Sequence, residues 1–103
     1  MSSFVRFSSP FLKGLTQANT SVTATTAGSA VTLLAKAEPH ERRAVVIVQN
    51  QNTTNYVYLL LNDSNTVGLL VPPLGAVTFD NYNGIIKAYA SATSIVHVAY
   101  ATA

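Results

Sequence analysis

Short apolar segments alternate with polar turns along most of the chain. Residues 20–26 place Val22 and Ala24 between threonines, which is the period-two pattern of a half-buried strand. Residues 44–49 and 56–61 are apolar on both faces, so we expect each strand to be covered on both sides. The polar stretch between them predicts that these two strands form a hairpin. Further strands are predicted at 30–35, 67–71, 76–79, 85–90 and 94–101.

The connections between these segments have the composition of tight turns. Asparagine and threonine are prominent in 50–55 and 62–66, and such side chains bond the local backbone. In residues 72–75 (Pro-Pro-Leu-Gly) the prolines fix φ and the glycine is free to take a positive φ. Turns recur about every eight to twelve residues, without a helical period or a sequence repeat. About eight short strands spaced in this way predict an all-β fold, an antiparallel β-sandwich that is jelly-roll-like.

Residues 1–19 differ from this body, residues 20–103, and we interpret them as an N-terminal arm. The arm holds three of the four phenylalanines in the chain, while Pro10 and Gly14 interrupt any long helix. It either folds back as an edge strand or cover of its own core, or packs on a neighbouring subunit. The arm residues predicted to form an interface are Phe4, Phe7, Phe11, Leu12 and Leu15.

The chain carries few charges for a small domain. Only 10% of its residues are charged, whereas 49% are hydrophobic. Soluble domains usually contain about 25% charged residues, so we expect part of this surface to be hidden in contacts with other molecules. Half of the charges lie in residues 36–43, where Pro39 makes a continuous strand unfavourable. We interpret this segment as an exposed loop, a solvated connection in preference to a charged docking site.

Tyrosine is favoured at interfaces because it joins an apolar ring to a polar tip. Tyr56 and Tyr58 lie on a strand that is apolar on both faces, so one side must meet a second layer or another subunit. Tyr100 shares a face with Val96 and Val98 and is predicted to belong to the core. The residues predicted to form an interface on the body are Tyr56, Tyr58, Arg42 and Arg43.

The sequence lacks the patterns of common catalytic and metal-binding sites. It contains no cysteine, which excludes a thiol nucleophile and thiolate ligands. The stretch 38–41 (Glu-Pro-His-Glu) lacks the spacing of the HExxH motif, and we interpret it as plain loop. His97 lies on the strand face opposite the predicted core. We therefore expect no enzymatic activity, no cofactor and no metal ion.

The low net charge argues against nucleic acid as a partner, and the short apolar runs argue against a membrane. A formal net charge of +2 is too small to line a groove that follows a phosphate backbone. No apolar run reaches the length of a membrane-spanning helix, and the first residues lack the continuous apolar core of a signal peptide. The expected partners are therefore proteins.

Four stretches of the body carry a family resemblance. They are 43–50 (RAVVIVQN), 56–58 (YVY), 72–80 (PPLGAVTFD) and 82–84 (YNG), the last followed by an apolar strand. In this order they resemble the small β-sandwich modules of tailed-bacteriophage virion proteins. The resemblance covers about four-fifths of the chain and rests on turn chemistry and strand patterning. It does not include residues 1–19.

The resemblance implies a structural virion protein, most readily a capsid decoration protein or a minor capsid component. Such a protein would form a homo-oligomer, with a trimer favoured over a dimer, and would dock on other virion proteins such as the major capsid protein. It would be made in the host cytoplasm and function in the virion. The alternative is a receptor- or carbohydrate-binding module of a phage fibre or tail, with a glycan site near residues 80–84.

Overall fold

The computed structural model describes residues 14–62 and 68–102. Over these residues the chain forms eight strands and one short 3-10 turn, η1, at Ala27–Ser29. The strands are β1 (Gly14–Val22), β2 (Val31–Leu34), β3 (Arg43–Asn50), β4 (Val57–Leu61), β5 (Leu69–Val71), β6 (Ala76–Asp80), β7 (Ile86–Ala90) and β8 (Ser94–Thr102).

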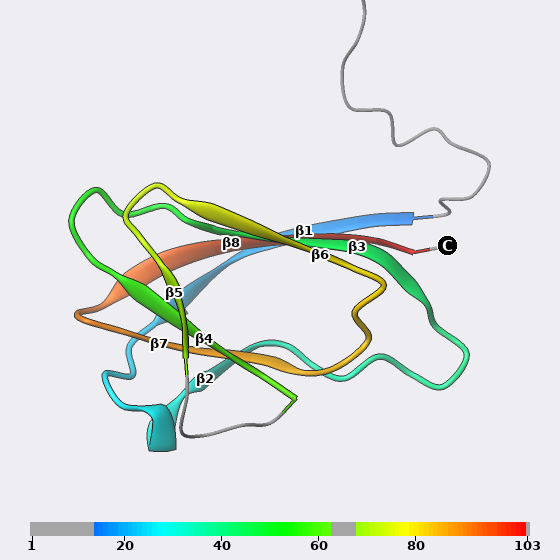
Figure 1. The fold of residues 1–103 in the computed structure, drawn as a ribbon, viewed down its shortest axis with the longest axis horizontal. Coiled ribbons are helices and arrows are strands. Elements are labelled where there is room, and N and C mark those ends of the chain that lie inside the picture. The colour runs from blue at the N-terminus through cyan, green and yellow to red at the C-terminus, as the bar shows by residue number, and fades with distance from the viewer. Residues whose placement is uncertain (1–13, 63–67, 103) are drawn as a thin grey trace, which may run out of the picture.

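The strands form two four-stranded sheets that pack face to face (Figure 1). The first sheet has the order β1-β8-β3-β6 and the second has the order β2-β7-β4-β5. Each early strand thus pairs antiparallel with a late one: β1 with β8, β2 with β7, β3 with β6 and β4 with β5. This pairing is that of a jelly roll, in which one long folded ribbon is wrapped into two sheets. The predicted all-β, antiparallel, jelly-roll-like sandwich is therefore confirmed.

The core lies between the two sheets and follows from the alternation of side chains along each strand. Val46 and Val48 face inward from β3, and Val57 and Leu59 face inward from β4; all four are buried. Tyr100 packs against this core, as predicted from its place beside Val96 and Val98 on β8. The buried cluster consists of Val22, Val46, Val48, Val57, Leu59, Val71, Ile86, Ala88, Ala90, Val96 and Val98.

The predicted hairpin between residues 44–49 and 56–61 is wrong. These residues lie in β3 and β4, which belong to different sheets, and β3 pairs with β6 and β8 instead. Two strands that are apolar on both faces can be buried equally well when they pair in one sheet and when they lie in two sheets that pack together. The pattern of apolar residues therefore predicted both strands and left their pairing undetermined.

A buried asparagine fixes the crossing between the sheets. The Asn50 side chain is fully buried at the end of β3. Its amide nitrogen donates to the carbonyl oxygens of Asn55 at 2.8 Å, Val71 at 3.2 Å and Pro72 at 3.2 Å. Its oxygen accepts from the backbone and side-chain nitrogens of Asn52, at 3.1 and 2.8 Å. One side chain thus ties the end of β3 to the following loop and to the end of β5.

The turn between β5 and β6 places its positive φ at a leucine. Gly75 donates its N–H to the Pro72 carbonyl at 2.9 Å, which closes a four-residue turn. The third residue of this turn, Leu74, has a φ of 61°, a value that glycine or asparagine usually adopts. Gly75 is needed for a different reason, because a Cβ there would lie 2.9 Å from Cγ of Pro72.

The first strand begins earlier than the sequence predicts. Residues 14–19, which we assigned to the arm, form most of β1 and pair with β8 without interruption. Residues 14–19 thus form an edge strand of their own sheet, which is one of the two alternatives for the arm. The sequence did not locate the start of β1 because almost every side chain of this strand is exposed. Leu15 belongs to this strand and is 48% exposed. The predicted interface residues Phe4, Phe7, Phe11 and Leu12 lie outside the described residues.

Candidate interaction surfaces

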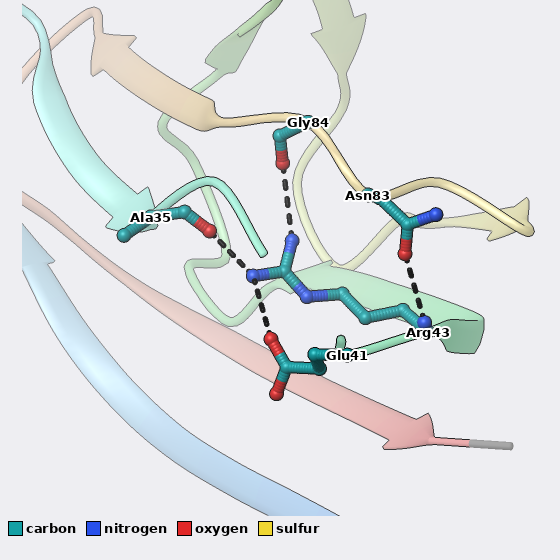
Figure 2. Close-up of polar contacts among 5 residues, drawn as sticks. All are labelled: Ala35, Glu41, Arg43, Asn83 and Gly84. Carbon is teal, nitrogen blue, oxygen red and sulfur yellow. Dashed lines mark hydrogen bonds and ion pairs between the residues drawn. The ribbon is translucent and has the colours of Figure 1, made fainter. Parts of the chain in front are cut away.

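Arg43, which was predicted to lie at an interface, is enclosed within its own chain (Figure 2). Its side chain is only 3% exposed, and Nη1 donates to the Gly84 carbonyl at 3.1 Å. Nη2 donates to the Ala35 carbonyl and lies 3.9 Å from Oε1 of Glu41. The guanidinium carbon also lies 5.2 Å from the centre of the Tyr100 ring. Arg43 therefore joins the start of β3 to the segments that contain Ala35 and Gly84. Its guanidinium group is too deeply buried to contact a partner protein.

A β-bulge explains why the sequence placed Arg43 wrongly. Between Arg43 and Val45 the pairing of β3 with β8 shifts by one residue, because Arg43 faces Thr102 while Val45 faces Ala101. The extra residue of a bulge breaks the alternation of side chains, so a residue before the bulge points to the opposite face from the one that regular alternation predicts. Regular alternation would point Arg43 outward with Val45, whereas the bulge brings it over the core. Arg42, one residue earlier, is exposed as predicted.

Tyr56 and Tyr58 do lie close to an exposed apolar surface. The ring of Tyr58 stacks on Tyr89 with 4.9 Å between ring centres and 12° between ring planes. Leu70 pairs with Tyr58 across β4 and β5 and is 47% exposed, and Tyr56 is 44% exposed. We call Tyr56, Tyr58, Leu70 and Tyr89 the tyrosine surface. Because paired residues of adjacent strands share a face, Tyr58, Leu70 and Tyr89 lie together on the outer side of the second sheet.

Gly68 allows the chain to pass closely over the tyrosine surface. A Cβ at this position would lie 2.8 Å from Cβ of Tyr58 and 3.1 Å from the hydroxyl of Tyr89. Contacts this short are not found between real side chains, so the segment before β5 can approach the stacked rings only with glycine. The sequence pattern did not predict this packing, since Gly68 falls within the predicted strand 67–71 and the partners Tyr58 and Tyr89 come from other strands.

His97 lies on the outer face of the first sheet, as predicted, and contacts the edge strand β1. Its Nδ1 is 2.7 Å from Oδ1 of Asn19, and its Nε2 is 3.2 Å from Oε1 of Gln17. Both ring nitrogens are therefore engaged with side-chain amides of one strand. Among the residues that the structure describes, no three potential ligands of the histidine, cysteine or acidic type gather at one place. His97 thus helps to position β1 and has no neighbouring acid or nucleophile among the residues it contacts.

The turn at residues 80–84 uses its polar groups to hold the fold. The Tyr82 hydroxyl donates to the Ile85 carbonyl at 2.7 Å and accepts from the Asn62 N–H at 2.8 Å. Oδ1 of Asn83 accepts from the Arg43 N–H at 2.8 Å. The Tyr82 hydroxyl and the side-chain oxygen of Asn83, two of the groups predicted for a glycan site, are therefore already bonded within the chain. A hollow of about 400 Å³ beside this turn is lined by Lys36, Asn62, Gly84 and Ile85.

A second hollow lies between β1 and β2. Its volume is about 230 Å³. Thr16 and Ala18 line it from the first sheet, and Leu33 and Leu34 line it from the second. Val98 and the ring of Tyr100 form part of its wall. We call this hollow the β1 groove; it is mainly apolar, and none of the described residues that line it is charged.

No protein-family model matches the chain, and none of the curated proteins matches it significantly. No helix among the described residues is long and apolar enough to cross a membrane.

Proposed function

We propose that this chain is a structural virion protein of a bacteriophage, a capsid decoration or minor capsid component that self-assembles and docks on the shell. The observation that carries the proposal is the combination of a jelly-roll sandwich with little charge and exposed apolar side chains. Jelly rolls recur in viral capsid proteins, although the fold alone does not define a function. The apolar residues at 1–13 and the resemblance to phage virion modules support the same reading.

The tyrosine surface is the part of the body that suits docking on a partner protein. It unites Tyr56 and Tyr58, both predicted interface residues, with the exposed Leu70. Stacked tyrosines offer a large contact area with few rotatable bonds, which lowers the entropy lost on binding. A partner that covers these rings would need to leave their hydroxyl groups bonded or in contact with water.

Co-sedimentation with capsid shells tests this proposal. The purified chain would be mixed with shells assembled from the major capsid protein of the same phage, and the pellet would be assayed for saturable binding. We expect Leu70→Ser to weaken binding at least tenfold, whereas Ile95→Ser, a matched change on the outer face of the first sheet, should leave it unchanged. A chain that stays in the supernatant at every concentration would refute docking on the shell.

A further inference from the structure

The first sheet extends beyond the cover that the second sheet provides. β1 has nine residues, whereas β2, which lies across the β1 groove from it, has only four and an irregular pairing between Thr32 and Leu34. Thr16 and Ala18 share a face with Tyr100 and Val98, which point toward the core. Both nevertheless remain exposed. Among the described residues, the inner face of β1 therefore has no layer packed upon it at Thr16 and Ala18, whereas Val22 on the same face is buried in the core.

The outer edge of β1 also lacks the features that usually prevent another strand from pairing with an edge strand. Among the described strands β1 pairs with β8 alone, in a register that runs from Gly14 to Val22 without a bulge. Natural edge strands usually carry a lysine, a proline or a bulge that prevents another strand from pairing. β1 contains neither charge nor proline. An unpaired backbone edge beside an apolar groove is the arrangement used by sites that bind an added β-strand.

We propose that residues 1–13 of a second copy of this chain bind as an added strand along β1, with apolar side chains in the β1 groove. This inference rests on the self-assembly proposed above and names its receiving surface. Thirteen residues span up to about 43 Å when extended, more than the roughly 30 Å length of a nine-residue strand. The segment can therefore follow the whole of β1.

The sequence of residues 1–13 suits this role. In an extended chain Val5, Phe7 and Phe11 fall on one face, which ends at Lys13. Arg6 and Ser8 fall on the other face, together with Phe4, Pro10 and Leu12. The first face matches the apolar wall of the groove. The second face is polar only at its middle, at Arg6 and Ser8, and would point away from the groove. Pro10 is tolerated because the added strand would itself become the edge of the sheet.

The place where this segment joins the body favours a neighbour over the same chain. Gly14 already pairs with Thr102 as the first residue of β1, and it has no positive φ. A chain returning to its own groove would have to reverse within residues 1–13, which would use up part of its length. A segment from a second copy can use all thirteen residues, and exchange between copies links the subunits.

Cross-linking of single-cysteine variants tests the proposal in the full-length protein. The chain has no cysteine of its own, so each introduced thiol is unique. Ser9→Cys keeps every phenylalanine, and Ala18→Cys places a thiol at an exposed position that lines the groove. Thr78→Cys, exposed on β6 at the opposite edge of the same sheet, is the matched control. Two variants are mixed, allowed to exchange subunits, and treated with a flexible bis-maleimide.

We expect a cross-linked dimer from Ser9→Cys mixed with Ala18→Cys, and at least tenfold less from Ser9→Cys mixed with Thr78→Cys. As a second variant, Ala18→Lys should abolish the oligomer at concentrations where Thr78→Lys retains it, because a charge would enter the groove.

Three results would overturn the inference while an oligomer persists. The first is equal cross-linking of Ser9→Cys to Thr78→Cys, and the second is efficient cross-linking of Ala18→Cys to itself. The third is a cross-link within one chain only, when a single chain carries both Ser9→Cys and Ala18→Cys. A monomer at all concentrations would overturn the proposed self-assembly as well.

Discussion

Arg43 and Asn50 determine, at the scale of single residues, how the two sheets are joined. Both side chains are buried and both satisfy backbone carbonyl groups from segments distant in the sequence. A buried carbonyl that loses its donor costs free energy even when the rest of the packing is kept. The stability of the sandwich should therefore depend on these two polar residues as strongly as on its valines.

For Arg43, we predict that Arg43→Met lowers the free energy of unfolding by about 3 kcal/mol. Methionine retains an unbranched apolar stem but leaves the carbonyls of Gly84 and Ala35 without their donor. The measurement is urea denaturation followed by circular dichroism. Arg42→Met is the control, since Arg42 is exposed and should change stability by no more than about 0.5 kcal/mol. Equal effects of the two substitutions would contradict the role given to Arg43.

For Asn50, we predict that Asn50→Asp destabilises the protein by roughly 3 kcal/mol although the two side chains have the same shape. The carboxylate would face three carbonyl oxygens to which the amide now donates, and it would be a buried charge without a cation. Thermal unfolding measures the effect. Asn81→Asp, at an exposed turn position, should leave the melting temperature nearly unchanged. A small effect at Asn50 would mean that its hydrogen bonds do not hold the crossing between the sheets.

At the scale of elements, the turn between β5 and β6 carries backbone strain. Leu74 holds a φ of 61° and is 59% exposed, so its side chain contributes little burial in return. Replacing it with asparagine, which tolerates this conformation, should raise the free energy of unfolding by about 1 kcal/mol. Leu74→Ala, which keeps the strain while removing most of the side chain, should show no such gain. Chemical denaturation of both variants would decide this, and equal stabilities would show that the strain is negligible.

The same elements show how far the sequence predicts the fold. Strand positions followed from apolar alternation, because a half-buried strand must repeat every two residues, and all strands from β2 to β8 were located within a few residues. The start of β1 was missed because its residues have no buried face. The pairing of β3 and β4 was missed because apolar character on both faces fits more than one arrangement. Strand order depends on contacts far apart in the sequence, which local patterns do not encode.

The interaction surfaces were predictable only in part, for a related reason. Tyr56 and Tyr58 were predicted to form an interface, and this stays a prediction; Tyr56 is exposed and Tyr58 is half-buried on the outer side of the second sheet. Arg43 was misplaced because a single extra residue in β3 reverses the facing of its side chain. Neither the β1 groove nor the stack of Tyr58 on Tyr89 had a signal in the sequence, because each joins residues from separate strands.

At the scale of the whole molecule, the composition favours self-assembly. A chain of 103 residues with 10% charged residues leaves Leu15, Leu69 and Leu70 exposed, and an oligomer would give such side chains a place to pack. The segment before β1 is proposed as the link between copies. Removing residues 1–13, and not 1–19 as the sequence first suggested, leaves β1 whole and so removes the link without cutting the sheet.

Self-assembly through residues 1–13 is tested by the solution mass of the full chain and of residues 14–103, measured by light scattering during size exclusion. Circular dichroism of the shorter chain would confirm that it retains its strands. We predict that the full chain has a mass of at least two times 10.9 kDa, and that the shorter chain is a monomer. A full chain that remains at 10.9 kDa at every concentration would contradict it.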